Sequence, residues 1–308
     1  MQPIKGVNRL RTPPQPDPQP VTPMPSPNRS STGRPASGSS ARPAKAKRSG
    51  SSQSSLGSAI RHNWLQVRTY VRQRPWLNTA YTLISRTILV LFLASVAWVV
   101  ILKYVPVWFT PLTISRKLDT IGTDKSSKIY KTWRPYSEIN REAALAVIAS
   151  EDQQFPYHWG FDFDEIQDAI KENQTRKRPR GASTISQQVA KNVFLWQGRS
   201  YVRKAAEAYF TILIELLWDK RRIMEMYLNV AEMGDCIFGV EAASQQYFHK
   251  SASKLSPQEA ALLAGVLPNP LRFRASNPGP QARAKQRRVL RNMRRLGGPA
   301  YVRELLND

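Results

Sequence analysis

The chain has 308 residues, 46 Lys and Arg against 22 Asp and Glu, and a formal net charge of +24. A single cysteine, Cys236, excludes an intrachain disulfide framework and any metal cage built from several cysteines. The charge total alone would favour a nucleic-acid binder, but the basic residues are spread unevenly, so each part of the chain is interpreted separately.

The first part is rich in proline, serine and basic residues. Residues 1–60 hold 11 of the 23 prolines, 12 serines, nine Lys or Arg, and one acid, Asp17. This composition offers too little apolar surface to offset the entropy lost on ordering. We expect residues 1–75 to form a disordered Pro/Ser/basic tail, with a docking motif inside it as the alternative.

An apolar run follows the tail. Residues 87–102 include 16 positions without a charge, about 24 Å of helix, which is short for a bilayer core of about 30 Å. Extension to Phe109 gives 23 residues, with Tyr104 and Trp108 suited to the membrane interface. We expect a transmembrane anchor with its flanks at 80–109, rather than a buried core helix or a cleaved signal sequence.

Basic residues flank this run on both sides, with an arginine cluster before it. Arg68, Arg72, Arg74 and Arg86 precede the run, and Lys103, Arg116 and Lys117 follow it. The positive-inside rule then predicts that the tail stays in the cytoplasm and that the chain after residue 110 is exported.

The exported part carries 31 Lys or Arg and 21 acids and shows mainly helical patterns. Capping residues, periodicity and terminal glycines predict helices at Glu142–Ser150, after Asp162, at Ser183–Leu195, Tyr201–Trp218 and Arg221–Ala231, after Ser256, and before Gly297. The last helix is arginine-rich, and we expect its charges to face solvent or lipid headgroups. Strand character is confined to Lys128–Trp133, so the predicted fold class is mainly α.

Two acids close the first of these helices, where they oppose the helix dipole. Glu151 and Asp152 are followed by an aromatic-rich segment that contains Phe155 and His158. A carboxyl group between an apolar helix and aromatic side chains is well placed for a raised pKa, as a general acid or base requires. The alternative is a pair of surface residues at a helix end.

A second polar group follows at residues 180–192. Thr184, Gln188 and Lys191 are spaced i, i+4 and i+7, so they share a helix face opposite an Ile/Val stripe. Ser183 or its neighbour offers an N-cap, and an open helix N-terminus attracts anions. These residues suggest a phosphate-binding site; an ordinary solvated helix face is the alternative.

The third group is a carboxylate with two cations beside it. Glu207 follows Arg203 and Lys204 and leads into an apolar helix that we expect to be buried. A surface ion pair worth about 0.3 kcal/mol is the alternative interpretation. In the next helix we interpret Glu225 and Asn229 as structural partners.

Four segments, in this order, resemble a known motif series: EDQQFPYHWGFD from Glu151, RGASTISQQVAKNVFL from Arg180, RKAAEAYFTILIE from Arg203, and KRRIMEMYLNVAEMG from Lys220. The series is similar to that of the peptidoglycan glycosyltransferases, glycosyltransferase family 51, and most of all to the monofunctional biosynthetic transglycosylases within it. The resemblance covers about residues 115–300, and 301–308 are then the C-terminal end.

The resemblance implies a lysozyme-like, two-lobed helical domain behind a single transmembrane helix. The protein would lie in a bacterial inner membrane, with its catalytic domain in the periplasm. It would polymerise lipid II, a disaccharide-pentapeptide on undecaprenyl pyrophosphate, into uncrosslinked β-1,4-linked glycan. The implied partners are lipid II, the nascent glycan chain, membrane lipids and proteins of cell division or wall synthesis, with no nucleic acid.

The resemblance also implies a role for each motif residue. Glu151 would be the general base, and Glu207 would assist departure of the pyrophosphate, directly or through a divalent cation, Mg²⁺ or Mn²⁺. No other cofactor is implied. The remaining residues would neutralise the pyrophosphate (Lys191, Arg203, Lys204), orient the substrates (Ser183, Thr184, Gln188, Asn192) or shape the cleft (Asp152, Phe155, His158).

Three other functions are compatible with parts of the sequence. A lytic, lysozyme-like muramidase would not need the cations around the second and third groups, because hydrolysis uses a carboxylic acid and a carboxylate. A non-catalytic membrane scaffold would use the basic tail. A bifunctional penicillin-binding protein would need more than the S-x-x-K match of Ser251 to Lys254, which we interpret as chance.

Overall fold

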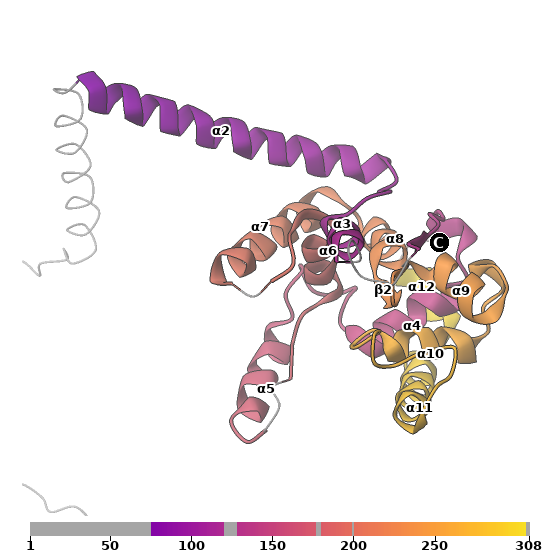
Figure 1. The fold of residues 1–308 in the computed structure, drawn as a ribbon. Coiled ribbons are helices and arrows are strands. Elements are labelled where there is room, and N and C mark those ends of the chain that lie inside the picture. Colours follow the sequence, from indigo (N-terminus) through magenta and orange to yellow (C-terminus); the bar gives the residue numbers. More distant parts are fainter. Residues whose placement is uncertain (1–74, 120–127, 177–179, 199, 306–308) are drawn as a thin grey trace, which may run out of the picture. The chain divides into compact units, whose positions relative to one another are not determined.

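A computed structural model describes residues 75–119, 128–176, 180–198 and 200–305. Apart from Pro75, the predicted tail lies outside the described residues. Most of the described chain is helical (Figure 1), so the mainly α fold class is confirmed. In chain order the elements are α2 Pro75–Tyr104, α3 Pro111–Leu118, β1 Tyr130–Lys131, η1 Tyr136–Glu138, α4 Arg141–Glu151, α5 Phe163–Asn173, α6 Ile185–Phe194, α7 Tyr201–Leu217, α8 Lys220–Val230, β2 Glu232–Gly234, β3 Ile237–Phe238, α9 Val240–Phe248, η2 Ala252–Lys254, α10 Pro257–Val266, α11 Pro280–Arg295 and α12 Pro299–Leu305.

Helix α2 is long and apolar enough to cross a membrane, with a candidate span of 29 residues at Trp76–Tyr104 in which an 18-residue window has a mean hydropathy of 2.2. Only 6% of its most apolar window is buried, so it is not a core helix. The expected helical extension to Phe109 is wrong. Helix α2 ends at Tyr104, because Pro106 has no N–H to donate and disfavours helix at the residue before it. The extra length comes instead from the N-terminal side, which places Arg86 inside the helix.

The C-terminal half of α2 is tied to α7 and the start of α8 by side-chain hydrogen bonds. The Trp218 indole N–H donates to the carbonyl of Val99 at 2.8 Å, and the Lys103 ammonium donates to the carbonyl of Leu217 at 2.8 Å. Arg222 donates to carbonyls of the chain at the end of α2, those of Leu102 and Val105, at 2.7 Å each. A cation at a helix C-terminus donates to the free carbonyls and interacts favourably with the negative end of the helix dipole. These contacts therefore stabilise the end of α2.

Helix α4 is largely buried beneath later helices of the chain. All seven of its residues from Ala143 to Ala149 are buried, and α10, α11 and α12 pack on it. The small side chains of α4 and α10 allow close helix packing. At Gly265 of α10, a Cβ would lie 3.3 Å from the backbone nitrogen of Gln286 in α11, so glycine permits the close approach of these two helices.

The helix that carries the second polar group, α6, packs against α7 and α8 (Figure 1). Its stripe of Ile185, Val189 and Val193 is buried, as the periodicity predicts. The N-cap is Thr184 rather than Ser183, and a capping box pairs it with Gln187. This arrangement leaves Ser183 exposed in the segment that leads into the helix.

Helices α7 and α8 are separate, because the chain turns at Trp218 and Asp219, whose carboxylate caps α8. The apolar residues of α7 are buried on one side only. Leu213 and Ile214 are in the core, whereas Ile212 and Leu216 are 49% and 64% exposed, so the expectation that the whole run is buried is wrong. A helical period of 3.6 residues places the side chains of a continuous apolar run on opposite sides of the helix. Only one of these sides packs against the rest of the described chain.

A small three-stranded sheet, in the order β1-β3-β2, is the non-helical part of the fold. Strand β1 shortens the predicted strand Lys128–Trp133 to two residues, and neither β2 nor β3 was expected from the sequence. Gly297 and Gly298 end α11 in positive-φ conformations as predicted, but the chain then forms α12, which packs on α4 through the buried Val302. Cys236 is buried, as expected.

The capping box at the start of α10 generates a stability prediction. The Ser256 hydroxyl accepts from the Glu259 N–H, and Glu259 in turn accepts from the Ser256 N–H at 2.8 Å. Ser256→Ala should lower the free energy of unfolding by about 1 kcal/mol, as loss of an N-cap does. Urea unfolding followed by circular dichroism would measure it, with the exposed Ser253→Ala as control. Equal midpoints for both variants would show that the cap contributes nothing.

Candidate active site

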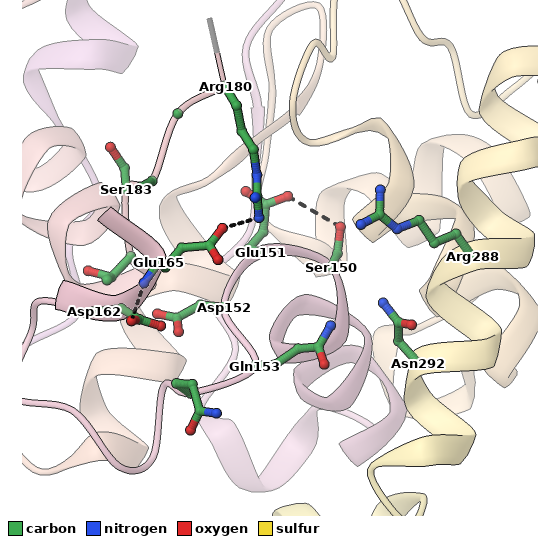
Figure 2. Close-up of a pocket in the computed structure, with 14 residues that line it drawn as sticks. Ser150, Glu151, Asp152, Gln153, Asp162, Glu165, Arg180, Ser183, Arg288 and Asn292 are labelled. Atoms are coloured by element: carbon green, nitrogen blue, oxygen red, sulfur yellow. Dashed lines mark hydrogen bonds and ion pairs between the residues drawn. The ribbon is translucent and has the colours of Figure 1, made fainter. Parts of the chain in front are cut away.

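A cavity of about 320 Å³ lies at the C-terminal end of α4 (Figure 2). Four stretches of chain line it: residues 150–154 at and just after the end of α4, Asp162 and Glu165 at the start of α5, residues 180–184 before α6, and Arg288 and Asn292 of α11. Polar and charged side chains dominate its wall, and Glu151 is among them. The first and second polar groups of the sequence therefore meet here.

Two hydrogen bonds hold the Glu151 carboxylate. Gln188 donates from Nε2 to one oxygen at 3.1 Å, and the Ser150 hydroxyl donates to the other at 3.3 Å. Burial raises the pKa of Glu151, while these two hydrogen bonds and the charge of Lys285 oppose the rise. A desolvated carboxylate that keeps one amide donor is suited to accept a proton near neutral pH.

Tyr227 orients the glutamine that holds Glu151. Its hydroxyl donates to Oε1 of Gln188 at 3.2 Å, which leaves Nε2 of the amide to face Glu151. Burial raises the pKa of Tyr227 well above its ordinary value, so the hydroxyl remains a donor. Tyr227 is buried in the core, and the sequence did not indicate this polar contact.

Asp152 is buried and joins two segments around the cavity. Its carboxylate accepts from Nε2 of His158 at 3.0 Å and from the backbone N–H of Ile185 at 3.0 Å. Nδ1 of His158 accepts from the Gly160 N–H at 3.1 Å, so the His158 proton is on Nε2 and points at Asp152. The Thr184 hydroxyl donates to the Gly160 carbonyl at 2.7 Å and completes the connection.

The third group forms a compact ion cluster at the start of α7. Glu207 is 4% exposed. Arg203 donates to one of its oxygens at 2.8 Å and Lys204 to the other at 2.5 Å. The surface-pair interpretation is therefore wrong: the cluster has a buried carboxylate with both oxygens paired.

Lys191 lies within the electrostatic field of both Glu151 and the Glu207 ion cluster. Burial lowers its pKa most, Arg203 and Lys204 lower it further, and the charges of Glu207 and Glu151 act in the opposite direction. A partly desolvated lysine in a field with two other cations attracts an anion strongly. The arrangement offers a base on one side and a concentrated positive charge on the other.

The remaining expected site residues differ in their surroundings. Phe155 is fully buried, with the Lys220 ammonium 4.7 Å from its ring centroid. Asn192 is buried in α6, whereas the exposed Ser183 lines the cavity. Phe155 and Asn192 are not among the residues that line the cavity, so within the described chain they contribute packing around it.

Helix α11 contributes residues that the sequence analysis missed. Arg288 and Asn292 line the cavity, and the charge of Lys285 acts on Glu151. These positions are spaced i, i+3 and i+7, so they share one helix face, and that spacing could have identified them. From the sequence we expected only solvent or lipid headgroups as partners of the charged side chains of this helix.

The residues around Glu207 do not fit a divalent cation held by the protein alone. Hard cations take several carboxylate or carbonyl oxygens, but both Glu207 oxygens are paired with cationic side chains. Among the described residues no group of three or more His, Cys, Asp or Glu is arranged to hold a metal ion.

Three residues singled out in the sequence are structural. The Asn229 amide accepts from the Arg134 N–H and donates to the Arg134 carbonyl, each at 2.8 Å, and Glu225 accepts from the Tyr136 N–H at 3.2 Å. The structural interpretation of both is confirmed. Ser251 caps η2 and donates to Glu241 at 3.2 Å, which accounts for it without a catalytic role.

Comparisons with known proteins agree on one family. The transglycosylase family model matches residues 116–294. The biosynthetic peptidoglycan transglycosylase of Cronobacter sakazakii is 50% identical over 218 residues, 70% of this chain and 90% of that protein. Similar relatives with the same name occur in Pectobacterium carotovorum, 49% identical over 230 residues (74% and 93% of the two chains), and Bdellovibrio bacteriovorus, 50% identical over 207 residues (67% and 83%).

The desolvated carboxyl generates a prediction about stability. Because burial raises the pKa of Glu151, ionising it is less favourable in the folded than in the unfolded chain, and stability is lost as pH rises through that pKa. Glu151→Gln removes this penalty. Its melting temperature at neutral pH should exceed that of the wild type by about 2–4 °C, and the gap should close near about pH 4.

The exposed Glu138→Gln is the control for this experiment and should leave the melting temperature unchanged at both pH values. A Glu151→Gln variant that melts at or below the wild-type temperature at neutral pH would contradict the expected desolvation of Glu151.

Proposed function

The chain belongs to the transglycosylase family. On that premise we propose how the reaction is divided between the cavity around Glu151 and the ion cluster around Glu207. The protein is a peptidoglycan glycosyltransferase with a lysozyme-like helical domain, and it polymerises glycan strands. The observation that carries the division of roles is the contrast between the two carboxylates: Glu151 is desolvated with a single amide partner, and Glu207 is neutralised by two cations.

Glu151 acts as the general base. An incoming sugar enters the cavity at the end of α4, where its 4-hydroxyl donates its proton to the carboxylate. The oxygen attacks the anomeric carbon of the growing chain, so the C1–O4 bond forms as the bond from C1 to the pyrophosphate breaks. The configuration at C1 inverts to β. Ser183 and Thr184, which line this cavity, orient the sugar together with Gln188.

The cations of α6 and α7 stabilise the leaving group. The lipid pyrophosphate gains negative charge as its bond to C1 breaks, and it departs without a proton when positive charge is in place. Lys191, Arg203 and Lys204 supply that charge. Glu207 holds Arg203 and Lys204 in position and sets the net charge of the cluster. On this scheme the substrates are lipid II and the nascent glycan chain.

Hydrolysis of finished glycan fits this site less well. Glycoside hydrolysis pairs a carboxylic acid with a second, free carboxylate. Glu151 could supply the acid, but both oxygens of Glu207 accept hydrogen bonds from cations, so Glu207 is not free for the second role. The relatives are also named for biosynthesis rather than degradation.

We assign the protein to the bacterial inner membrane as a single-pass protein. The candidate span Trp76–Tyr104 is the anchor. The arginines before and within α2 support a cytoplasmic N-terminus and a periplasmic catalytic domain. Proteins of cell division or wall synthesis are the expected partners, because a nascent glycan strand must be joined to the existing wall.

Loss of the base should abolish synthesis. Purified full-length Glu151→Gln, given lipid II, should make glycan about 10²–10⁴-fold more slowly than the wild type, as loss of a general base does. Gel analysis of the product would measure it. Glu142→Gln is the matched control, because burial also raises the pKa of Glu142, on the same helix, yet it does not line the cavity.

Two results would overturn these roles. Normal polymerisation by Glu151→Gln would show that another group is the base. Release of soluble fragments from finished wall by the wild type would favour the lytic alternative.

Gln188 should affect the pH dependence of kcat/KM through the pKa of Glu151. Its N–H donates to the Glu151 carboxylate and favours the charged form, so Gln188→Leu should raise the pKa of Glu151 further. The acid limb of the kcat/KM profile should therefore move to higher pH. Tyr227→Phe should move it in the same direction by less, because Gln188 keeps its amide. A lower rate with an unmoved acid limb would reduce Gln188 to a packing role.

A further inference from the structure

A second cavity, of about 530 Å³, lies just after the end of α2. Its lining comes from the chain that follows the anchor, from α3, and from the start of β1. The apolar part of the wall is made by Trp108, Phe109, Ile114 and Leu118, each of which is more than half exposed. Exposed apolar side chains this close to a membrane-spanning helix belong at the level of the lipid headgroups and upper acyl chains.

Lys131 of β1 lines the same cavity, and nothing in the described chain pairs with it. Its ammonium nitrogen is shielded from water and has no hydrogen-bond partner among the described residues. Burial lowers the pKa of Lys131 to about 8, with no opposing charge to raise it. A buried ammonium without a partner costs free energy, and a ligand that pairs with it would remove that cost.

This cavity is separate from the catalytic one. No residue is common to the two linings, and Lys131 is not among the charges that act on Glu151 or on Lys191. No Asp or Glu is among the described residues that line it, and Lys117 adds a second cationic side chain to the wall. The lining therefore combines apolar surface with positive charge alone.

We infer that this cavity binds one anionic glycerophospholipid of the bilayer, with the headgroup phosphate on Lys131 and the acyl chains along the exposed side chains of Trp108, Phe109, Ile114 and Leu118. Lysine has a flexible stem with four methylene groups, so its ammonium can turn into the cavity to meet a phosphate. The ion pair would satisfy the buried charge, and the lipid would cover the apolar wall.

The charges favour a phospholipid over the substrate lipid as occupant. A phosphodiester carries one negative charge, which a single buried lysine matches. A lipid pyrophosphate carries more charge, and the cluster of Lys191, Arg203 and Lys204 already offers three cations for it. The position directly after the anchor also keeps the cavity at the bilayer surface.

Native mass spectrometry of the full-length chain in detergent would test this site. The probes are phosphatidylglycerol and phosphatidylcholine with identical acyl chains. Both carry the phosphate, but the choline ammonium of phosphatidylcholine neutralises its charge and would oppose Lys131. The wild type should therefore bind one phosphatidylglycerol about tenfold tighter than phosphatidylcholine. Lys131→Met should bind both equally. Lys128→Met is the matched control, because Lys128 is exposed, does not line the cavity, and should leave the preference intact.

A second variant tests the apolar part of the site. Ile114→Trp fills the cavity without changing a charge and should weaken binding of both lipids. Lys131→Met removes an unpaired buried charge, so its melting temperature should not fall below that of the wild type. A Lys131→Met protein that keeps the preference for phosphatidylglycerol would overturn the proposal. Displacement of bound phosphatidylglycerol by undecaprenyl pyrophosphate would overturn it too, since the cavity would then belong to the substrate path.

Discussion

The carboxylate of Asp152 joins two segments that are 33 positions apart in the chain. It accepts from the His158 ring and from the backbone N–H of Ile185, at the N-terminus of α6. A buried carboxylate is stable only when its oxygens are satisfied, and the positive end of a helix is a favourable partner. This contact fixes the end of α4 against the start of α6, and the positions of Glu151 and Gln188 both depend on it.

In the proposed mechanism the two polar regions meet opposite electrostatic requirements. A general base is poorly solvated, and Glu151 has few partners and a pKa that burial raises. A leaving pyrophosphate needs concentrated positive charge, and three cations placed together would repel one another. Glu207 offsets that repulsion from a buried position between Arg203 and Lys204. The charges of Glu207 and Glu151 both act on the pKa of Lys191, so this lysine links the two regions electrostatically.

The membrane anchor is also connected to the catalytic helices. Helix α7 carries the ion cluster in its first two turns, and at its other end the Leu217 carbonyl accepts from Lys103 of α2. Arg222, in the first turn of α8, holds the carbonyls at the end of α2. Ile212 and Leu216 leave an apolar face of α7 exposed. In the proposed membrane-bound arrangement, a substrate whose lipid stays in the bilayer would reach the ion cluster from that side.

The sequence by itself determined the helices, the apolar span and the order of the chemical groups, because these depend on local periodicity, caps and residue type. The stripe of α6, the glycine stop of α11 and the pairing of Glu207 with nearby cations are all short-range. Tertiary structure alone decided that Tyr227 orients Gln188 and that α11 brings Arg288 to the cavity. It also decided that the Lys131 ammonium is buried with no partner in the part of the chain that the structure describes. These depend on contacts between residues far apart in the chain, where packing rather than local propensity sets the distance. The net charge of +24 likewise has its functional meaning only in the fold, where a few of the 46 basic residues gather around Glu207.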